Sequence, residues 1–150
     1  MLPHTYPSLA LIETQEEALR QEVAQLSTDN KRAFYTKLGK DNKDPDTYAA
    51  LVFLLFLGFH HAYLRQFKAC LLEATWQISM WALVISHWYS YDSFASWGWL
   101  GLGLNALFDL MHLAFSQRIV RWYNYQVAQQ SLKDLQPSMQ TISSRAEPRS

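Results

Sequence analysis

The sequence has little of several features, and each scarcity excludes a class of protein. Cys70 is the only cysteine among 150 residues, so the chain cannot form an internal disulfide. Basic and acidic residues balance at 13 each, and no basic stripe indicates a nucleic-acid partner. Residues 1–13 lack the basic start and long apolar run of a signal peptide. Nucleophile–base pairs, phosphate loops and dinucleotide fingerprints are missing too, so no enzymatic activity is predicted.

Charged residues are scarce between positions 47 and 123. This block holds four of the 13 Lys and Arg residues and three of the 13 Asp and Glu residues. It contains three apolar segments, at residues 48–64, 69–91 and 94–116. A membrane span needs roughly 20 mainly apolar residues, and the second and third segments qualify with polar interruptions. The first is marginal, because only residues 49–59 are continuously apolar.

The positions of Lys and Arg indicate a topology, because cytoplasmic loops near spans collect these residues. Basic residues flank the first segment on both sides and follow the third, but the 89–97 loop has none. That loop and the residues that flank it are rich in Trp and Tyr, as is typical of a membrane–water interface. We expect the second and third segments to form a membrane hairpin and the first to be re-entrant. Both termini would then be cytoplasmic, in the inner membrane if the source is bacterial. Three full spans are the alternative.

The predicted fold is all-α and has three parts. Residues 1–46 form a polar N-terminal arm of amphipathic cytosolic helices. Residues 47–125 form the membrane domain. Residues 126–150 form a polar C-terminal tail, and its Ser, Arg, Pro and Gln content predicts disorder from residue 137 onward.

Two helices are predicted within the N-terminal arm. Thr14 and Glu17 have the spacing of a capping box, which predicts a helix over residues 15–26. A second helix would begin at residue 29 or 30 and stop at Gly39, which suits a C-terminal cap. Pro45 then suits a turn or the first turn of the next helix.

A short motif spans the first and second apolar segments. Residues 55–73 read LFLGFHHAYLRQFKACLLE, an apolar run followed by Gly58, His60, Tyr63 and Leu64. This resembles the pattern Gly-x-His-x-x-Tyr-Leu-Gly of the TM-two domain family, small proteins with two transmembrane helices. The last Gly of the pattern is an Arg here. The resemblance covers residues 47–125.

The later part of the family pattern is matched less completely. Asp109 matches the family's later acid, but Asn105 stands where the family has Trp. Arg118, Arg121 and the pair that follows at 123–124 resemble its basic exit. The resemblance implies a membrane-embedded domain with two spans. It implies no catalytic activity.

Polar side chains recur inside the apolar segments at helical spacing. On a helical third segment Asn105, Asp109 and His112 share one face, and Glu73 and Gln77 share a face on the second. If the two helices are antiparallel, a rise of 1.5 Å per residue places Glu73 at the same depth as His112, and Gln77 at the same depth as Asp109. These are the predicted partners. The first segment could contribute a histidine from the same side. The predicted intramembrane polar cluster is His60, Glu73, Gln77, Asn105, Asp109 and His112.

This cluster has more than one interpretation. It is either a set of hydrogen bonds that holds the three segments together or a proton or cation site. His60, His61, His112 and Glu73 are suitable metal ligands but lack diagnostic spacing. Haem ligation by His60 with His87 or His112 would lack an attachment motif. No metal and no cofactor is therefore predicted.

Three glycines, Gly98, Gly101 and Gly103, make one side of the third segment thin. Small residues let helix backbones approach in lipid. This side is therefore a helix seam either within the chain or between copies of it.

From these features we expect a non-enzymatic integral membrane protein that serves as a subunit, scaffold or regulator of a membrane assembly. Its expected partners are the lipid bilayer and a protein, either a different one or further copies of the chain. One alternative is a small proton- or cation-conducting oligomer that uses Glu73, Asp109 and His112. Another is a haem- or metal-handling membrane protein that uses the histidines.

Overall fold

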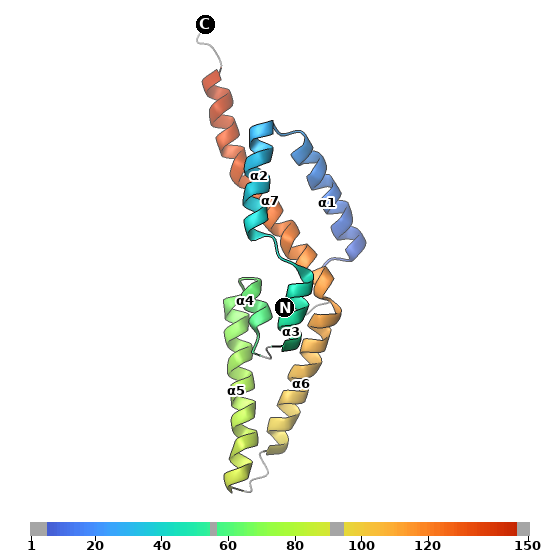
Figure 1. Ribbon diagram of the computed structural model, residues 1–150, viewed down its shortest axis with the longest axis vertical. Coiled ribbons are helices and arrows are strands. Elements are labelled where there is room, and N and C mark those ends of the chain that lie inside the picture. Colours follow the sequence, from blue (N-terminus) through green and yellow to red (C-terminus); the bar gives the residue numbers. More distant parts are fainter. Residues whose placement is uncertain (1–5, 55–56, 91–94, 147–150) are drawn as a thin grey trace. The chain divides into compact units, whose positions relative to one another are not determined.

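The computed structural model describes residues 6–54, 57–90 and 95–146, and all regular structure in these ranges is helical, as predicted. The contacts divide the chain into two compact units, a central unit of residues 43–120 and an arm unit of residues 6–42 with those from 121 onward. The helices are α1 (Leu9–Ala24), α2 (Thr28–Asp41), α3 (Pro45–Leu54), α4 (Phe59–Tyr63), α5 (Phe67–Ser90), α6 (Ala95–Ala114) and α7 (Ser116–Ala146) (Figure 1).

Helix α1 begins earlier than predicted. Ser8 is its N-cap, and the Ser8 hydroxyl accepts a hydrogen bond from the Leu11 backbone N–H at 3.3 Å, a typical use of serine at a helix start. The predicted capping box at Thr14 and Glu17 is wrong, because both residues lie inside the helix. The Thr14 hydroxyl donates to the Ala10 carbonyl at 3.0 Å instead.

The predicted second helix is confirmed as α2, with different ends. It begins at Thr28, one or two residues before the predicted start, with Ser27 as its N-cap. The helix continues through Gly39, the predicted stop, and ends at Asp41. Glycine inside a helix is less favourable than alanine by up to about 1 kcal/mol, a cost small enough for the neighbouring residues to offset.

Helix α3 begins at Pro45, as predicted, and Asp44 holds its first turn. The Asp44 carboxylate accepts hydrogen bonds from the Thr47 hydroxyl at 2.7 Å and the Thr47 backbone N–H at 2.6 Å. These two bonds stabilise the charged carboxylate and lower the pKa of Asp44 below its ordinary value. The Asp44 backbone N–H donates to the Tyr63 hydroxyl at 2.9 Å, which ties the start of α3 to the end of α4.

The first apolar segment forms two short helices, α3 and α4. Neither approaches the roughly 20 residues that a span requires. Gly58 directly precedes α4 and has left-handed backbone angles, with φ of 73°, which glycine adopts without steric cost. Gly58 therefore allows the chain to turn before α4.

Helices α5 and α6 lie antiparallel (Figure 1), and α3 and α4 pack between them at the end where α5 begins and α6 ends. A Cβ atom at Gly98 would lie 2.7 Å from Val84 Cγ2, and one at Gly101 would lie 2.2 Å from Met80 Sδ. The Trp76 indole N–H donates to the Gly101 carbonyl at 3.4 Å. Gly98 and Gly101 therefore form a helix seam within the chain, whereas a Cβ at Gly103 would meet no atom within 4 Å.

By length and composition, one helix in the described ranges could cross a membrane by itself, Phe67–Ser86 within α5, with a mean hydropathy of 1.3. Ser96–Ala114 and Ser116–Leu135 qualify only when taken together as one span with a bend at Phe115. The second predicted segment therefore qualifies as a candidate span, whereas the third does not qualify alone. Its polar residues, among them Asn105, Asp109 and His112, lower its mean hydropathy.

The arm unit has a small apolar core and charged contacts around it. Its core consists of Val23 from α1, Phe34 from α2, and Ala128 and Leu132 from α7. Lys37 and Asp134 form an ion pair between α2 and α7. The hydrogen bond from Lys37, followed by one from Gln130, lowers the pKa of Asp134 below its ordinary value.

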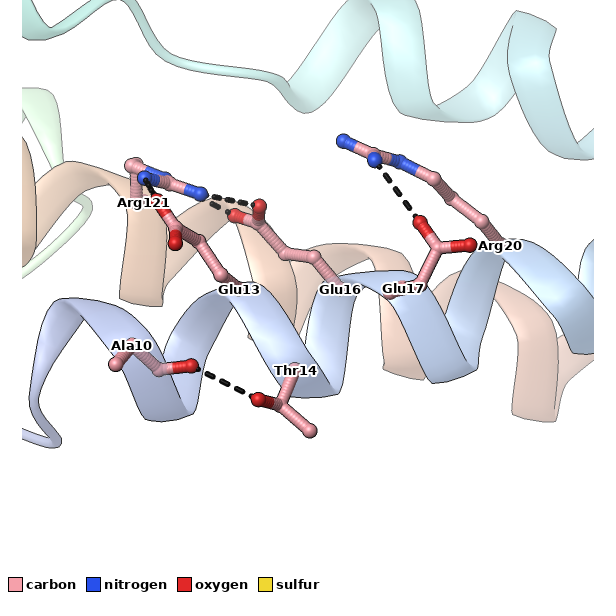
Figure 2. A network of polar contacts seen from close by, with 7 residues as sticks. All are labelled: Ala10, Glu13, Thr14, Glu16, Glu17, Arg20 and Arg121. Atoms are coloured by element: carbon pink, nitrogen blue, oxygen red, sulfur yellow. Dashed lines mark hydrogen bonds and ion pairs between the residues drawn. The ribbon is translucent and has the colours of Figure 1, made fainter.

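Arg121 joins α7 to α1 within the same unit. Its guanidinium lies 3.0 Å from Glu13 Oε1 and 2.7 Å from Glu16 Oε2, and Figure 2 shows the two carboxylates flanking it. The hydrogen bonds to Glu16 and then Glu13 raise the pKa of Arg121. The two acceptors, Glu13 and Glu16, lie one turn apart on α1.

The predicted disordered tail is wrong for residues 137–146. Helix α7 continues to Ala146. Residues 138–146 contain neither glycine nor a second proline, so no strong helix breaker follows Pro137 until Pro148. Residues 147–150 lie outside the described part of the chain.

Candidate functional site

The predicted polar cluster is distributed over three helices of the central unit. His60 lies on α4, Glu73 and Gln77 on α5, and Asn105, Asp109 and His112 on α6. Four of the six side chains are buried, namely His60, Gln77, Asp109 and His112. Polar side chains therefore occupy the interior where α4 packs between α5 and α6.

Three imidazole rings form the centre of this interior. The ring centroids of His60 and His61 are 4.1 Å apart, and each lies within 5.3 Å of the His112 centroid. The three residues are 2%, 8% and 6% exposed, in the order His60, His61, His112. Tyr48 of α3 places its ring edge-on to His60 at 5.5 Å. All three rings are thus removed from solvent and within reach of one another.

Glu73 lies beside the rings and contacts the two histidines of α4. Its Oε2 atom is 3.2 Å from His61 Nε2 and 3.7 Å from His60 Nε2. The predicted partner of Glu73 was His112, but its direct contact is with His61. The difference follows from Gly58, because a Cβ atom there would lie 3.1 Å from Glu73 Oε2. The left-handed turn before α4 brings that helix directly against the carboxylate.

The α6 residues of the cluster are oriented mainly by neighbours one turn away. Asn105 Nδ2 donates to Asp109 Oδ2 at 2.9 Å. The sequence predicted Gln77 as the partner of Asp109, and this hydrogen bond comes from Asn105 instead. His112 Nδ1 lies 3.0 Å from the Phe108 carbonyl. A carbonyl oxygen can only accept, so the proton of His112 is on Nδ1.

Several polar atoms of the cluster are buried without a hydrogen-bond partner among the described residues. They are His60 Nε2, His61 Nδ1 and Glu73 Oε1. Buried polar side-chain atoms in proteins usually have a partner, so each such atom requires an explanation. His61, Glu73, Asp109 and His112 also line an open cavity of about 560 Å³. The arrangement can therefore accept a small polar or cationic species from one side.

The residues that carry the family resemblance are structural in this arrangement. Gly58 forms the turn before α4, and Tyr63 binds the backbone at the start of α3. Leu64 is buried after α4. Two of the matching residues, His60 and Asp109, belong to the polar interior itself.

The sequence indicates His61 only as a possible metal ligand, and it is not part of the predicted cluster. Adjacent residues of a helix do not share a face, so a helix that packs on one side would bury only one of the two histidines. Here α4 is only five residues long and packs on two sides, against α3 and α5. Both histidines are therefore buried.

Comparisons of the chain with known protein families, with curated proteins and with solved structures each return no match. The resemblance to the TM-two domain family stays a prediction from the motif. The candidate site therefore depends on the geometry of the central unit alone.

Proposed function

We propose that the chain is a non-enzymatic integral membrane protein whose central unit lies in the bilayer and whose arm unit binds a protein partner in the cytoplasm. It would act as a subunit, scaffold or regulator of a membrane assembly. Helices α5 and α6 would form a membrane hairpin, with α3 and α4 as a re-entrant segment and both termini cytoplasmic.

The central observation is that the central unit places apolar side chains outside and polar side chains inside. On α5, Leu71 and Leu72 are 70% and 74% exposed, and only 11% of the apolar window of this helix is buried. On α6, Leu107 and Leu110 are exposed to a similar degree. A water-soluble bundle has the reverse pattern, whereas lipid-facing helices expose apolar residues and turn polar ones inward.

The polar interior supports a role in holding the segments together. Glu73 links α5 to α4 through His61, and Asp44 links α3 to α4 through Tyr63. Hydrogen bonds of this kind stabilise packing where lipid supplies no hydrophobic drive between helices. These contacts would hold the short helices α3 and α4 between the two long helices α5 and α6.

The arm unit provides a surface for a partner. An open groove of about 350 Å³ in this unit is lined by apolar residues such as Leu19, Phe34 and Tyr35 and by the charged residues Glu16 and Arg121. Tyr35 is 58% exposed. A mixture of exposed aromatic and Arg side chains is typical of protein interfaces.

The proposal is tested by extraction and by capture. The full chain should stay in the membrane pellet after an alkaline wash and be released by detergent. Affinity purification from detergent, followed by native mass spectrometry, should recover it with a second protein at fixed stoichiometry. Substitution of Tyr35 by Ala should weaken that recovery, and substitution of the exposed Leu107 by Ala should not. Release by the alkaline wash would contradict the membrane placement, and recovery of the chain alone would contradict the scaffold role.

A second candidate function, a proton or cation conduit, is favoured by the cavity next to Asp109. Substitution of Asp109 by Asn keeps the shape and most of the hydrogen-bonding capacity but removes the charge. A scaffold should keep its expression level and its partner in this variant. A conduit should lose ion flux in proteoliposomes while the protein remains folded. We expect the scaffold result.

A further inference from the structure

We propose that His60, His61 and His112 bind a divalent transition-metal ion in the interior of the central unit. One ring nitrogen of each of these residues lies within 4.8 Å of the others. The ligand set combines two adjacent residues of α4 with one residue of α6, more than 50 positions later in the chain. No sequence spacing could have identified it.

The hydrogen bonds around the rings leave suitable donor atoms free. The proton of His112 is on Nδ1, which donates to the Phe108 carbonyl, so the lone pair is on Nε2. His61 Nε2 faces the Glu73 carboxylate at 3.2 Å, which places its proton there and its lone pair on Nδ1. Histidines that bind metals commonly donate their other ring N–H to a carbonyl or a carboxylate in this way.

One of the two nitrogens left free by this assignment, His61 Nδ1, also needs a partner, as does one nitrogen of His60. His61 Nδ1 and His60 Nε2 are both buried without a hydrogen-bond partner in the described part of the chain. The 3.7 Å between His60 Nε2 and Glu73 Oε2 is too long for a hydrogen bond. A metal ion in contact with these two nitrogens and with His112 Nε2 would satisfy them together.

The ligand type defines the class of metal. Imidazole nitrogen favours Zn²⁺, Cu²⁺, Ni²⁺ and Co²⁺ over Mg²⁺ and Ca²⁺, which prefer oxygen. Three histidines leave a fourth position open, and two of the three, His61 and His112, also line the cavity of the central unit. The Glu73 carboxylate lies close to His60, and its negative charge would partly offset that of the ion.

Binding at this site does not depend on the proposed scaffold role. A metal could be bound whether or not the arm unit has a partner. The two proposals therefore fail separately, since the metal is tested on the purified chain and the scaffold on its recovery from membranes.

The test uses the full chain, purified in detergent without a polyhistidine tag and stripped with a chelator. Co²⁺ is the probe, because its visible absorption reports coordination by protein nitrogen. We expect one Co²⁺ per chain by equilibrium dialysis, with the absorption of a four-coordinate site, and displacement by Zn²⁺. His61→Gln and His112→Gln should each weaken binding by at least about tenfold. Glu73→Gln should weaken it by roughly tenfold, because the Nε2–H of His61 loses its negatively charged partner.

His87→Gln is the matched control. It also removes one histidine from the chain, but His87 lies fourteen residues after Glu73 on α5, about 21 Å along the helix axis at 1.5 Å per residue. The affinity of the His87→Gln variant for Co²⁺ should equal that of the unsubstituted chain. Circular dichroism and size-exclusion chromatography check that each variant is folded.

A second measurement uses only the unsubstituted chain, so it does not depend on the variants folding. Zn²⁺ should shift the ¹⁵N NMR resonances of the imidazole rings of His60, His61 and His112 and leave those of His87 unchanged. The proposal is overturned if the chain binds no stoichiometric Co²⁺, if the variants bind as tightly as His87→Gln, or if Zn²⁺ shifts no imidazole resonance.

Discussion

Gly58 is the residue on which the broken first segment depends. Residues with a Cβ atom rarely adopt its φ of 73°. A Cβ added at this position would lie 3.1 Å from Glu73 Oε2 and 3.2 Å from Glu73 Cβ. We expect Gly58→Ala to lower the free energy of unfolding by roughly 1–3 kcal/mol, the usual cost of a strained backbone at a constrained position. Thermal unfolding in detergent, followed by circular dichroism, measures it.

Gly39 provides the matched control for this substitution. It lies within α2, and an added Cβ would meet no atom within 4 Å. Gly39→Ala should therefore stabilise its helix by up to about 1 kcal/mol. Equal effects of the two substitutions would show that the turn at Gly58 does not need glycine.

Asp134 makes the stability of the arm unit depend on pH. Its folded-state pKa is lowered, first by the bond from Lys37 and then by that from Gln130, so the unfolded chain binds its proton more readily. The stabilisation is therefore complete above the unfolded pKa of about 3.9 and is lost as the pH falls through the lower folded value. The melting temperature of the unsubstituted chain should exceed that of Asp134→Asn at pH 7, and the difference should disappear in acid. In a Lys37→Met background the same comparison should give a much smaller difference at every pH.

At the scale of elements, the close approach of α5 and α6 depends on Gly98. A Cβ atom there would lie 2.7 Å from Val84 Cγ2 and 2.9 Å from the Met80 backbone oxygen, which cannot rotate away. We expect Gly98→Ala to cost about 1–3 kcal/mol by overpacking. Gly103→Ala, where the added atom meets nothing within 4 Å, should not destabilise α6. If both variants unfold at the temperature of the unsubstituted chain in detergent, the two helices do not pack through this seam.

Element types were predictable from the sequence, whereas several boundaries were not. Apolar runs and Pro45 correctly indicated α3 and α5. The start of α1 was missed, because Ser8 and Thr14 are both good capping residues and only tertiary context decides between them. The extent of α7 was missed because composition at 137–146 indicates low hydrophobicity, and composition alone does not exclude a helix continued from a packed one.

At the scale of the whole molecule, the proposed placement makes a prediction about sides of the membrane. Single cysteines at Lys40, Asp92 and Lys133 in a Cys70→Ser background distinguish the topologies. Lys40 and Lys133 are exposed, and Asp92 lies at 91–94, outside the described residues. An impermeant thiol reagent on intact cells should label only position 92, and all three after permeabilisation. Labelling of position 133 in intact cells would indicate three full spans.

The sequence predicted which residues form the candidate site better than it predicted which of them contact one another. Helical spacing correctly placed Asn105, Asp109 and His112 on one helix, and burial of Asp109 and His112 followed from their apolar surroundings. The contact between His61 and Glu73 could not be predicted, because it depends on the direction in which the chain leaves Gly58. The direction of the backbone after a residue with left-handed angles cannot be predicted from the periodicity of the sequence.

The short helices α3 and α4 have a consequence for the surrounding lipid. They fill the space between α5 and α6 only where α5 begins and α6 ends, so that end of the central unit has four helices in cross-section. At the opposite end, the described residues place only α5 and α6. Ten residues of α3 rise about 15 Å, half of a hydrocarbon core of about 30 Å. In the proposed placement the unit is a wedge that displaces more area from one leaflet than from the other, and many copies together would favour a curved membrane over a flat one.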